Sequence, residues 1–358
     1  MKKTSVLFIT TIASCLFFMP QFLAAQKQNK LFDSDELIQL NLKGNIKQLL
    51  ADRGDSKSKY FPFQINCDAN GDTATIPVNI KTRGHFRRIR NNCVYPPLLL
   101  NFPKKEKLAA SIFKGQDKLK LVMPCAGENY VVKEWLVYKI YNLVTPQSFK
   151  ARLVKVKMDD NSSDKTYGPF YGILIEDEKK MAKRNGVVAV TKKIDPEQAD
   201  QMPFFNMAIF EYMIGNTDWC VQYLQNVKLL AEDSTGIIPV TVPYDFDHSG
   251  IVNTPYAHPA EALLMSDVRE RRFRGYCVEN IKDYDSSIAI FNRIKDQVYA
   301  LYNSCELLDD KYKKITIKYL DDFYEIINNP VLLKKALRYP CDRNGTGNVL
   351  IKGLRDDD

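Results

Sequence analysis

The sequence predicts an α+β protein with two lobes, one rich in sheet and one rich in helix. The first half alternates apolar and polar residues over short runs, as at 74–81, which is typical of strands. The second half repeats apolar residues at helical spacing, most clearly at 286–327. The 358 residues are 45% hydrophobic and 26% charged, which is typical of a globular chain and argues against disorder and coiled coil. We therefore expect a sheet-rich N-lobe over 26–180 and a helix-rich C-lobe over 181–358.

The N-lobe is expected to contain several short strands and one long helix. Alternating or continuous apolar runs predict strands at 74–81, 97–102, 118–123, 153–158 and 171–176. A polar turn at 159–168 joins the last two strands, which predicts a hairpin. Apolar and aromatic residues recur at near-helical spacing over 130–144, so we expect a helix there. The broken pattern of 33–52 predicts strand pieces followed by a short helix.

The C-lobe is expected to be mostly helical. A buried helix is predicted at 203–214, and Gly215 is a typical helix end. A hairpin of strands 227–230 and 237–242 is expected after it. Further helices are predicted at 286–307, 310–327 and 330–337.

The N-terminus has the features of a secretory signal peptide. Lys2 and Lys3 precede an apolar run, and small residues before Gln26 offer a cleavage site. We expect residues 1–25 to be removed and the protein to be periplasmic or extracellular. A lipoprotein is the alternative, because the residues up to Cys15 resemble a lipid-attachment box, although the apolar run continues beyond that cysteine. No later run reaches the 18 apolar residues of a membrane span.

Charge and metal-binding residues narrow the ligand classes. Loss of the leader lowers the formal net charge from +8 to +6, which suits a phosphate-bearing ligand but is weak for a nucleic-acid binder. The chain has only three histidines and no close cysteine pair, which argues against zinc and favours oxygen ligands for any metal. Seven cysteines follow the leader, so at least one thiol stays unpaired in a monomer, and the spacing leaves the pairing open.

Acidic and amide side chains cluster around the hairpin expected in the C-lobe. Asp218 follows the helix, Asn226 precedes the hairpin, and Asp245 follows it. An antiparallel hairpin returns Asn226 and Asp245 to the same edge, and Asp218 can lie beside them. Phosphoryl transfer needs an Asp near the attacking hydroxyl and oxygen ligands for magnesium. The alternative is that these residues are ordinary caps and turn residues.

Four segments, in order, resemble the spore-coat-protein-H-like (CotH-like) kinases, an atypical branch of the protein-kinase-like fold. Residues 80–84 are similar to that family's strand ending in Arg-Gly, and residues 167–176 to its hairpin with Gly-x-Tyr and a following Glu. Residues 215–218 are similar to its catalytic loop, and residues 243–247 to its Pro-Trp-Asp-x-Asp metal motif. The resemblance covers about residues 75–250 and implies a two-lobed kinase-like fold that uses ATP and Mg²⁺.

The resemblance also implies a role for each matching side chain. Asp218 would orient or deprotonate the acceptor hydroxyl of a protein or small molecule. Asn226 and Asp245 would bind the metal, and Asp247 would support a second metal ion. Glu176 would lie near the hinge that contacts the nucleotide. The implied reaction is transfer of the ATP γ-phosphoryl group.

Three cations are candidates for the nucleotide phosphates. Arg83 precedes a glycine, and this pairing suits phosphate binding. The family's usual lysine is absent from the strand after Arg-Gly, so Lys118 and Lys120 on the next strand are the substitutes. Glu134 is either the partner of that lysine or an exposed helical residue.

The spacing of the metal ligand also differs from the common pattern. Asn226 lies eight residues after Asp218 instead of the common five, so either the loop bulges or Gln222 is the nearer neighbour of Asp218.

Two basic runs and two rival functions remain open. Residues 83–90 form either a phosphate-binding loop or a solvated hairpin tip, and 269–274 either an acceptor-binding surface or a charged helix face. One rival function is a kinase-like binding or surface-assembly protein without catalysis. The other is a metal-dependent phosphate-ester hydrolase. No G-x-S-x-G elbow is present, and His248 is adjacent to Ser249 in sequence, which argues against a hydrolase triad.

Overall fold

The computed structural model describes residues 31–339 with gaps at 54–56, 70–71, 104–107 and 109–110. The expected signal peptide, with Cys15, lies outside the described residues, and so does Cys341. No helix in the described part of the chain is long and apolar enough to cross a membrane.

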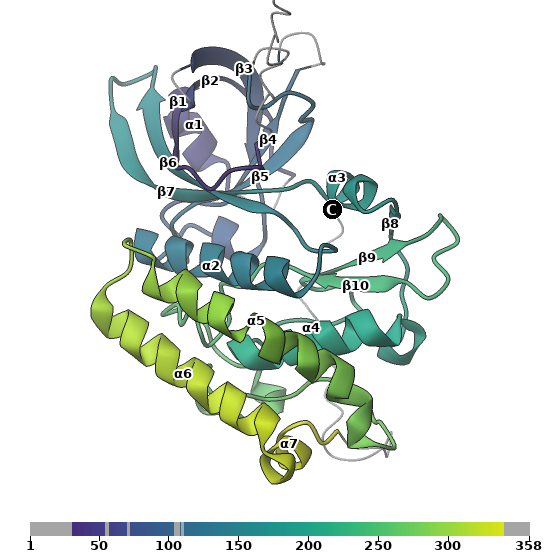
Figure 1. Cartoon of the computed structure of the whole chain (residues 1–358). Coiled ribbons are helices and arrows are strands. Elements are labelled where there is room, and N and C mark those ends of the chain that lie inside the picture. Colours follow the sequence, from purple (N-terminus) through teal and green to yellow (C-terminus); the bar gives the residue numbers. More distant parts are fainter. Residues whose placement is uncertain (1–30, 54–56, 70–71, 104–107, 109–110, 340–358) are drawn as a thin grey trace, which may run out of the picture.

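Seven strands form a closed barrel in the N-terminal region (Figure 1). They are β1 (Ile38–Gly44), β2 (Phe61–Ala69), β3 (Asp72–Thr82), β4 (Leu98–Asn101), β5 (Lys118–Val122), β6 (Ala151–Asp160) and β7 (Thr166–Ile175). Their order is β1-β2-β3-β4-β5-β7-β6, and parallel pairing of β1 with β6 closes the ring. Every second residue of β1 is buried in the barrel core, as the alternation of side chains in a strand requires. The short helix α1 (Ile46–Ala51) packs against this core through Ile46 and Leu49.

The predicted sheet-rich N-terminal and helix-rich C-terminal regions are confirmed. The sheet, however, is a closed barrel, which the two-lobed kinase-like prediction did not include. Strand β2 was also not predicted, although it pairs with β3 along its whole length. Closure depends on pairing between Ile38 and Val154, residues far apart in the chain. Hydrophobic periodicity reports the faces of a strand but not its partner.

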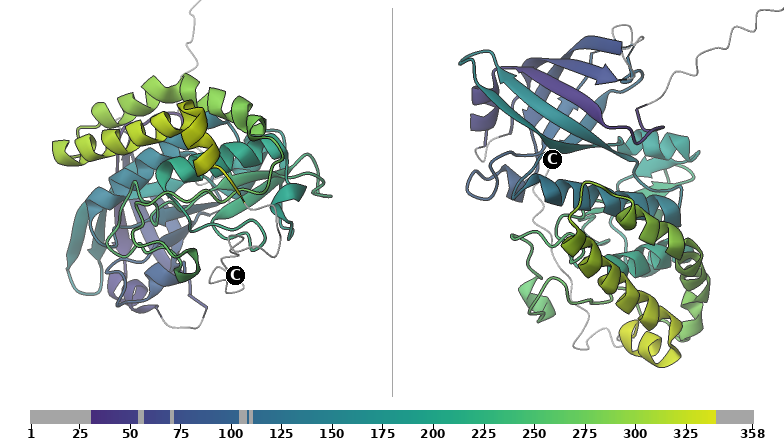
Figure 2. Two further views of the ribbon diagram at one scale, coloured as in Figure 1. Left: turned by 90° about the horizontal axis from the view of Figure 1, so that it is seen from below. Right: turned by 60° about the vertical axis from the view of Figure 1, so that its left-hand side comes forward.

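Helix α2 (Glu128–Val144) lies between the barrel and the C-terminal helices (Figure 2). Its residues are buried around most of its circumference, and they join one hydrophobic core with the C-terminal helices. Lys133 of α2 lies 3.9 Å from the ring centroid of Tyr312, which adds a cation–π contact between the two layers. The helix is therefore a fixed part of the C-terminal core.

The C-terminal region combines helices with a small sheet (Figure 1). The helices are α3 (Glu178–Arg184), α4 (Gln201–Ile214), α5 (Asp285–Asn303), α6 (Asp310–Asn328) and α7 (Pro330–Ala336), with 3-10 turns at Pro196–Gln198, Glu261–Leu263 and Ile281–Tyr284. The sheet has the order β10 (Val240–Pro243), β9 (Val227–Ala231), β8 (Val188–Val190). The predicted helices and hairpin of this region are confirmed. The predicted Asp218 and Asp245 therefore follow a buried helix and a paired strand.

Candidate functional site

The loop that carries Asp218 follows α4 directly. Gly215 ends the helix with φ of 67°, a left-handed conformation that glycine adopts without a Cβ clash. A Cβ at Gly215 would collide with the hydroxyl of Tyr319. The main-chain N–H of Asp218 then donates to Asn216 Oδ1 at 3.0 Å, which forms an Asx turn. These contacts hold Asp218 partly buried after a helix that is buried from Phe204 to Ile214.

Asn226 contacts Asp218 despite the eight-residue spacing. Cys220 and Gln225 form an antiparallel bridge with N···O distances of 3.0 and 2.9 Å, so residues 221–224 form a turn that takes up the extra length of the loop. Asn226 Nδ2 donates to the main-chain oxygen of Asp218 at 2.7 Å and to its Oδ2 at 3.1 Å. The bulged loop is confirmed. The Gln222 alternative is wrong, because its Oε1 accepts instead from the Cys220 thiol at 3.3 Å.

The β9–β10 hairpin brings Asp245 to the same edge. The N–H of Tyr244 donates to the main-chain oxygen of Asn226 at 3.0 Å, which joins the two ends of the hairpin. The N–H of Asp245 donates to the hydroxyl of Tyr138 on α2 at 3.0 Å. Asp245 has φ of 66°, an uncommon conformation for a residue with a side chain. Asn226 is thus bonded through its side chain to Asp218 and through its main chain to Tyr244, the residue before Asp245.

Lys120 and Arg83 supply positive charge opposite Asp245. Burial raises the pKa of Asp245, and Asp247 raises it further, whereas Arg87, Arg83 and Lys120 lower it. Lys120 Nζ lies 4.4 Å from the centroid of the Tyr244 ring. These cations and the Asp245 carboxylate share one small region, where they suit a bound phosphate and its metal ion.

Asp247 makes ionic contacts that the sequence did not indicate. Its Oδ2 lies 3.4 Å from Nη1 of Arg87 and accepts from the hydroxyl of Tyr256 at 2.9 Å. Arg87 also lies 3.8 Å from Glu134 Oε2 and donates to the main-chain oxygen of Met123 at 2.6 Å. Asp247 is therefore partly committed to an internal ion pair, with only Oδ1 left for the second metal that we predicted.

Glu134 is buried, so its predicted alternative as an exposed helical residue is wrong. Its partner is Arg87 and not the expected lysine. A signal was present in the sequence, because Val131 and Tyr138 place Glu134 on the apolar face of α2. Burial raises the pKa of Glu134 and so does Asp247, whereas Arg87 lowers it. The ion pair between these segments is a feature that sequence analysis missed.

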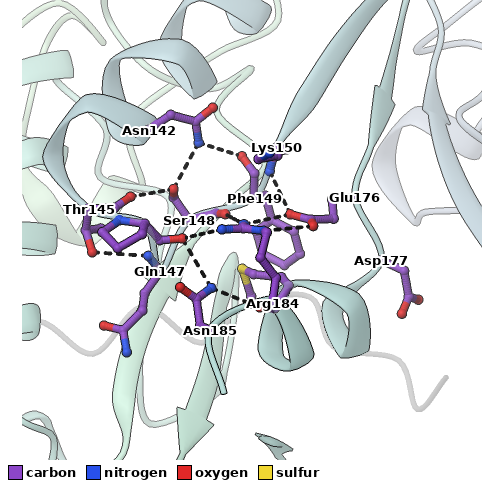
Figure 3. A network of polar contacts seen from close by, with 12 residues as sticks. Asn142, Thr145, Gln147, Ser148, Phe149, Lys150, Glu176, Asp177, Arg184 and Asn185 are labelled. Atoms are coloured by element: carbon purple, nitrogen blue, oxygen red, sulfur yellow. Dashed lines mark hydrogen bonds and ion pairs between the residues drawn. The ribbon is translucent and has the colours of Figure 1, made fainter. Parts of the chain in front are cut away.

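The side chain of Glu176 belongs to a network of polar contacts with Arg184 and Lys150 (Figure 3). Arg184 Nε donates to Glu176 Oε1 at 3.1 Å, and Arg184 Nη2 donates to Oε2 at 2.9 Å. The N–H of Lys150 donates to the same Oε2 at 3.1 Å. Glu176 follows β7 directly, at the junction of the two regions, and its place near a nucleotide-contacting hinge stays a prediction. Lys118, the other candidate for the phosphate lysine, is exposed.

The basic runs are largely tied into the fold. In the first run, Arg88 lies 3.6 Å from Asp52 and Arg87 is buried, so the solvated hairpin tip is wrong for these two residues, whereas Gly84, His85, Ile89 and Arg90 are exposed. In the second run, Arg271 Nε donates to the main-chain oxygen of Met213 at 3.2 Å. Arg274 Nη1 donates to the main-chain oxygen of Thr217 at 2.8 Å. The charged helix face is also wrong, because residues 269–274 form no helix.

The donor set fits a magnesium ion that also binds phosphate. Both contacts of Asn226 Nδ2 go to Asp218, which orients the amide and leaves Oδ1 as the ligand atom. No hydrogen bond or ion pair engages the Asp245 carboxylate in the described residues. Within those ranges, no three His, Cys, Asp or Glu side chains are grouped for metal binding. Magnesium is commonly held by one or two protein oxygens together with phosphate oxygens and water.

Comparisons with known proteins give one similar solved structure to report. No family model matches the chain, and no curated protein matches it. The crystal structure of the Helicobacter pylori proinflammatory kinase CtkA is similar over 72% of this chain and 94% of that chain. The sequence identity is 13% and the TM-score is 0.42. The relationship to the spore-coat-protein-H-like kinases stays a prediction.

Proposed function

We propose that this protein is an atypical kinase that transfers the γ-phosphoryl group of ATP to a hydroxyl of a protein or small molecule. The observation that supports the proposal is the meeting of Asp218, Asn226 and Asp245 at one edge, with Lys120 and Arg83 opposite. This arrangement has the parts that phosphoryl transfer needs: a carboxylate for the acceptor, oxygens for a metal, and cations for phosphates.

Each group has a distinct role in the proposed reaction. Asn226 Oδ1 and the Asp245 carboxylate would hold Mg²⁺, which supplies charge neutralisation for the phosphates. Lys120 and Arg83 would bind phosphate oxygens. The acceptor oxygen forms a bond to the γ-phosphorus as the bond to the β-phosphate oxygen breaks, and ADP leaves. Asp218 takes the proton of the acceptor hydroxyl.

The environment of Asp218 is suited to a general base. Burial raises the pKa of Asp218, His248 lowers it, Asp247 raises it, and hydrogen bonding from Asn226 lowers it. The net effect is a raised pKa, so the carboxylate is more basic than one on the surface. Its geometry is held by the amides of Gln225 and Asn226.

We also propose that the mature protein is exported. Cys93 and Cys125 form a disulfide, and Cys277 is disulfide-bonded as well. Disulfides persist in oxidising compartments and are rare in the cytosol. The proposal is supported by the leader-like residues 1–25.

A thermal-shift titration with ATP and Mg²⁺ tests the nucleotide site. A ligand that binds only the native state raises the melting temperature. We expect a shift that requires Mg²⁺, and we expect Asp245→Ala to abolish the Mg²⁺-dependent part. Glu232→Ala, an exposed substitution in the same hairpin, is the control and should retain the full shift.

The outcomes separate the candidate functions. A shift that depends on Mg²⁺ and Asp245, followed by transfer of labelled γ-phosphate that Asp218→Asn removes, supports a kinase. Nucleotide binding without transfer supports the non-catalytic binding or surface-assembly protein. Release of phosphate from an ester without a nucleotide supports the hydrolase. The absence of any shift at millimolar ATP contradicts the nucleotide site.

Nucleotide affinity is expected to fall as the pH rises through about 7. Burial, Arg83 and Lys228 lower the pKa of Lys120 to about 7. Above this pH the free protein loses the charge that would pair with phosphate, so the Kd for ATP should rise by up to about tenfold per pH unit. Binding measured by calorimetry from about pH 6 to about pH 9 checks this expectation. A constant Kd over that range would contradict the role of Lys120.

A further inference from the structure

Arg87 has no direct role in the proposed reaction, yet it joins four segments around the site. It lies in the 3-10 turn Phe86–Arg88 that follows β3, and it is buried. Its guanidinium contacts the main-chain oxygen of Met123 after β5, Glu134 on α2, and Asp247 after β10. A forked guanidinium can satisfy several acceptors in fixed directions, whereas a lysine ammonium cannot reproduce that geometry.

The segment with Asp245 is held from two sides. On one side, the hydroxyl of Tyr138 accepts from the N–H of Asp245 at 3.0 Å. On the other side, Arg87 and Tyr256 hold Asp247, two residues further along the chain. Between them, Phe246 is fully buried, with its ring centroid 4.7 Å from that of Tyr138. The left-handed conformation of Asp245 persists only when neighbouring contacts fix it.

A disulfide ties together two of the segments that Arg87 joins. Cys93 lies six residues after Arg87, and Cys125 lies two residues after Met123. The Cα atoms of the two cysteines are 4.6 Å apart. The covalent bond therefore limits how far the Arg87 turn can move from the start of α2.

We propose that Arg87 is a positioning residue that directs the Asp245 carboxylate toward its metal, and that the Cys93–Cys125 disulfide holds Arg87 in place. The proposal rests on the proposed nucleotide and metal site. It assigns Asp247 to the support of Asp245 instead of to a second metal ion. It also makes assembly of the site dependent on an environment in which the disulfide forms.

The test compares Arg87→Lys with Arg88→Lys, a neighbour whose partner Asp52 lies on the barrel side. At a fixed ATP concentration, the Mg²⁺ concentration for half-saturation should rise about tenfold or more in Arg87→Lys, because losing an outer support of a metal ligand has effects of that size. Arg88→Lys should stay within about twofold of the parent. In the double variant Cys93→Ser/Cys125→Ser, the Mg²⁺ concentration for half-saturation should also rise, as in Arg87→Lys. Measurement well below each melting temperature separates this effect from a loss of stability.

Hydrogen–deuterium exchange of residues 240–250 gives a readout that does not require nucleotide. Arg87→Lys and the double cysteine variant should exchange faster in this segment than the parent and Arg88→Lys. If the parent binds no nucleotide, the proposed function fails while exchange still tests the support of Asp245. Unchanged exchange together with an unchanged Mg²⁺ requirement in Arg87→Lys would overturn the positioning role. If the Mg²⁺ requirement and the exchange of residues 240–250 change in Arg87→Lys but not in the double cysteine variant, the role assigned to the disulfide is overturned.

Discussion

Replacing Lys120 with methionine is expected to weaken nucleotide binding and, at the same time, to raise the melting temperature of the ligand-free protein. Lys120 is held among Arg83, Lys228 and the ring of Tyr244, where a charged ammonium is poorly solvated. Methionine fills a similar volume without that cost. Loss of a charged contact to phosphate should raise the Kd for ATP about tenfold or more. The melting temperature should rise by about 2 °C or more near neutral pH.

The stability gain should depend on pH in a defined direction. An unfolded lysine keeps its proton up to about pH 10.4, whereas the pKa of Lys120 in the folded protein is lowered to about 7. Between these values the unfolded state binds more protons, so the stability of the parent rises with pH. The advantage of Lys120→Met is therefore largest at about pH 7 and below, and it shrinks as the pH rises.

Lys118→Met is the matched control for this experiment. Lys118 lies two residues earlier on β5 and is exposed, so its replacement should change neither the Kd nor the melting temperature appreciably. A loss of affinity in Lys118→Met but not in Lys120→Met would transfer the phosphate role to Lys118. A lower melting temperature in Lys120→Met would show that the lysine stabilises the fold. That result would contradict the proposal that Lys120 is buried for phosphate binding at a cost in stability.

Local sequence rules account for the part of the site that lies on one continuous segment. Gly215 indicates the end of α4, and the apolar runs on either side of the turn indicate the β9–β10 hairpin. These features place Asn226 close to Asp245, because the first and last residues of an antiparallel hairpin lie at the same end of it. The spacing between Asp218 and Asn226 differs from the common one, but the bridge between Cys220 and Gln225 compensates for it.

The contacts that the sequence could not predict join residues far apart in the chain or on an unpredicted element. The partners Arg87 and Asp247 are 160 positions apart, and no periodic pattern relates them. Closure of the barrel through β1 and β6 is of the same kind, because each strand shows its buried face but not its neighbour. The partner of Glu176 was not predicted, since Arg184 belongs to helix α3, which the sequence analysis did not predict. Such contacts depend on the assembled fold.

Replacing Arg184 with methionine is expected to cause the largest loss of stability among these variants. Glu176 is buried, and Arg184 donates to both of its carboxylate oxygens (Figure 3). Arg184 also donates to the main-chain oxygens of Pro146 and Ser148, each at 2.8 Å. The substitution leaves a buried carboxylate without its cation, at a cost of about 2–4 kcal/mol given the partial exposure of Arg184. Chemical denaturation measures this difference.

Variants of both partners distinguish the ion pair from simple packing. Lys183→Met, an exposed substitution on the same helix, should stay within about 0.5 kcal/mol of the parent. Arg184→Lys should recover only part of the loss, because an ammonium cannot serve two carboxylate oxygens and two carbonyls in the same directions. In the double variant Glu176→Gln/Arg184→Met, the neutral amide removes the uncompensated charge, so the double change should be less destabilising than Arg184→Met alone. Strictly additive losses would show that the two side chains act independently. Because this network lies where β7 leads into the C-terminal region, its loss should also loosen the junction between the barrel and the proposed nucleotide site.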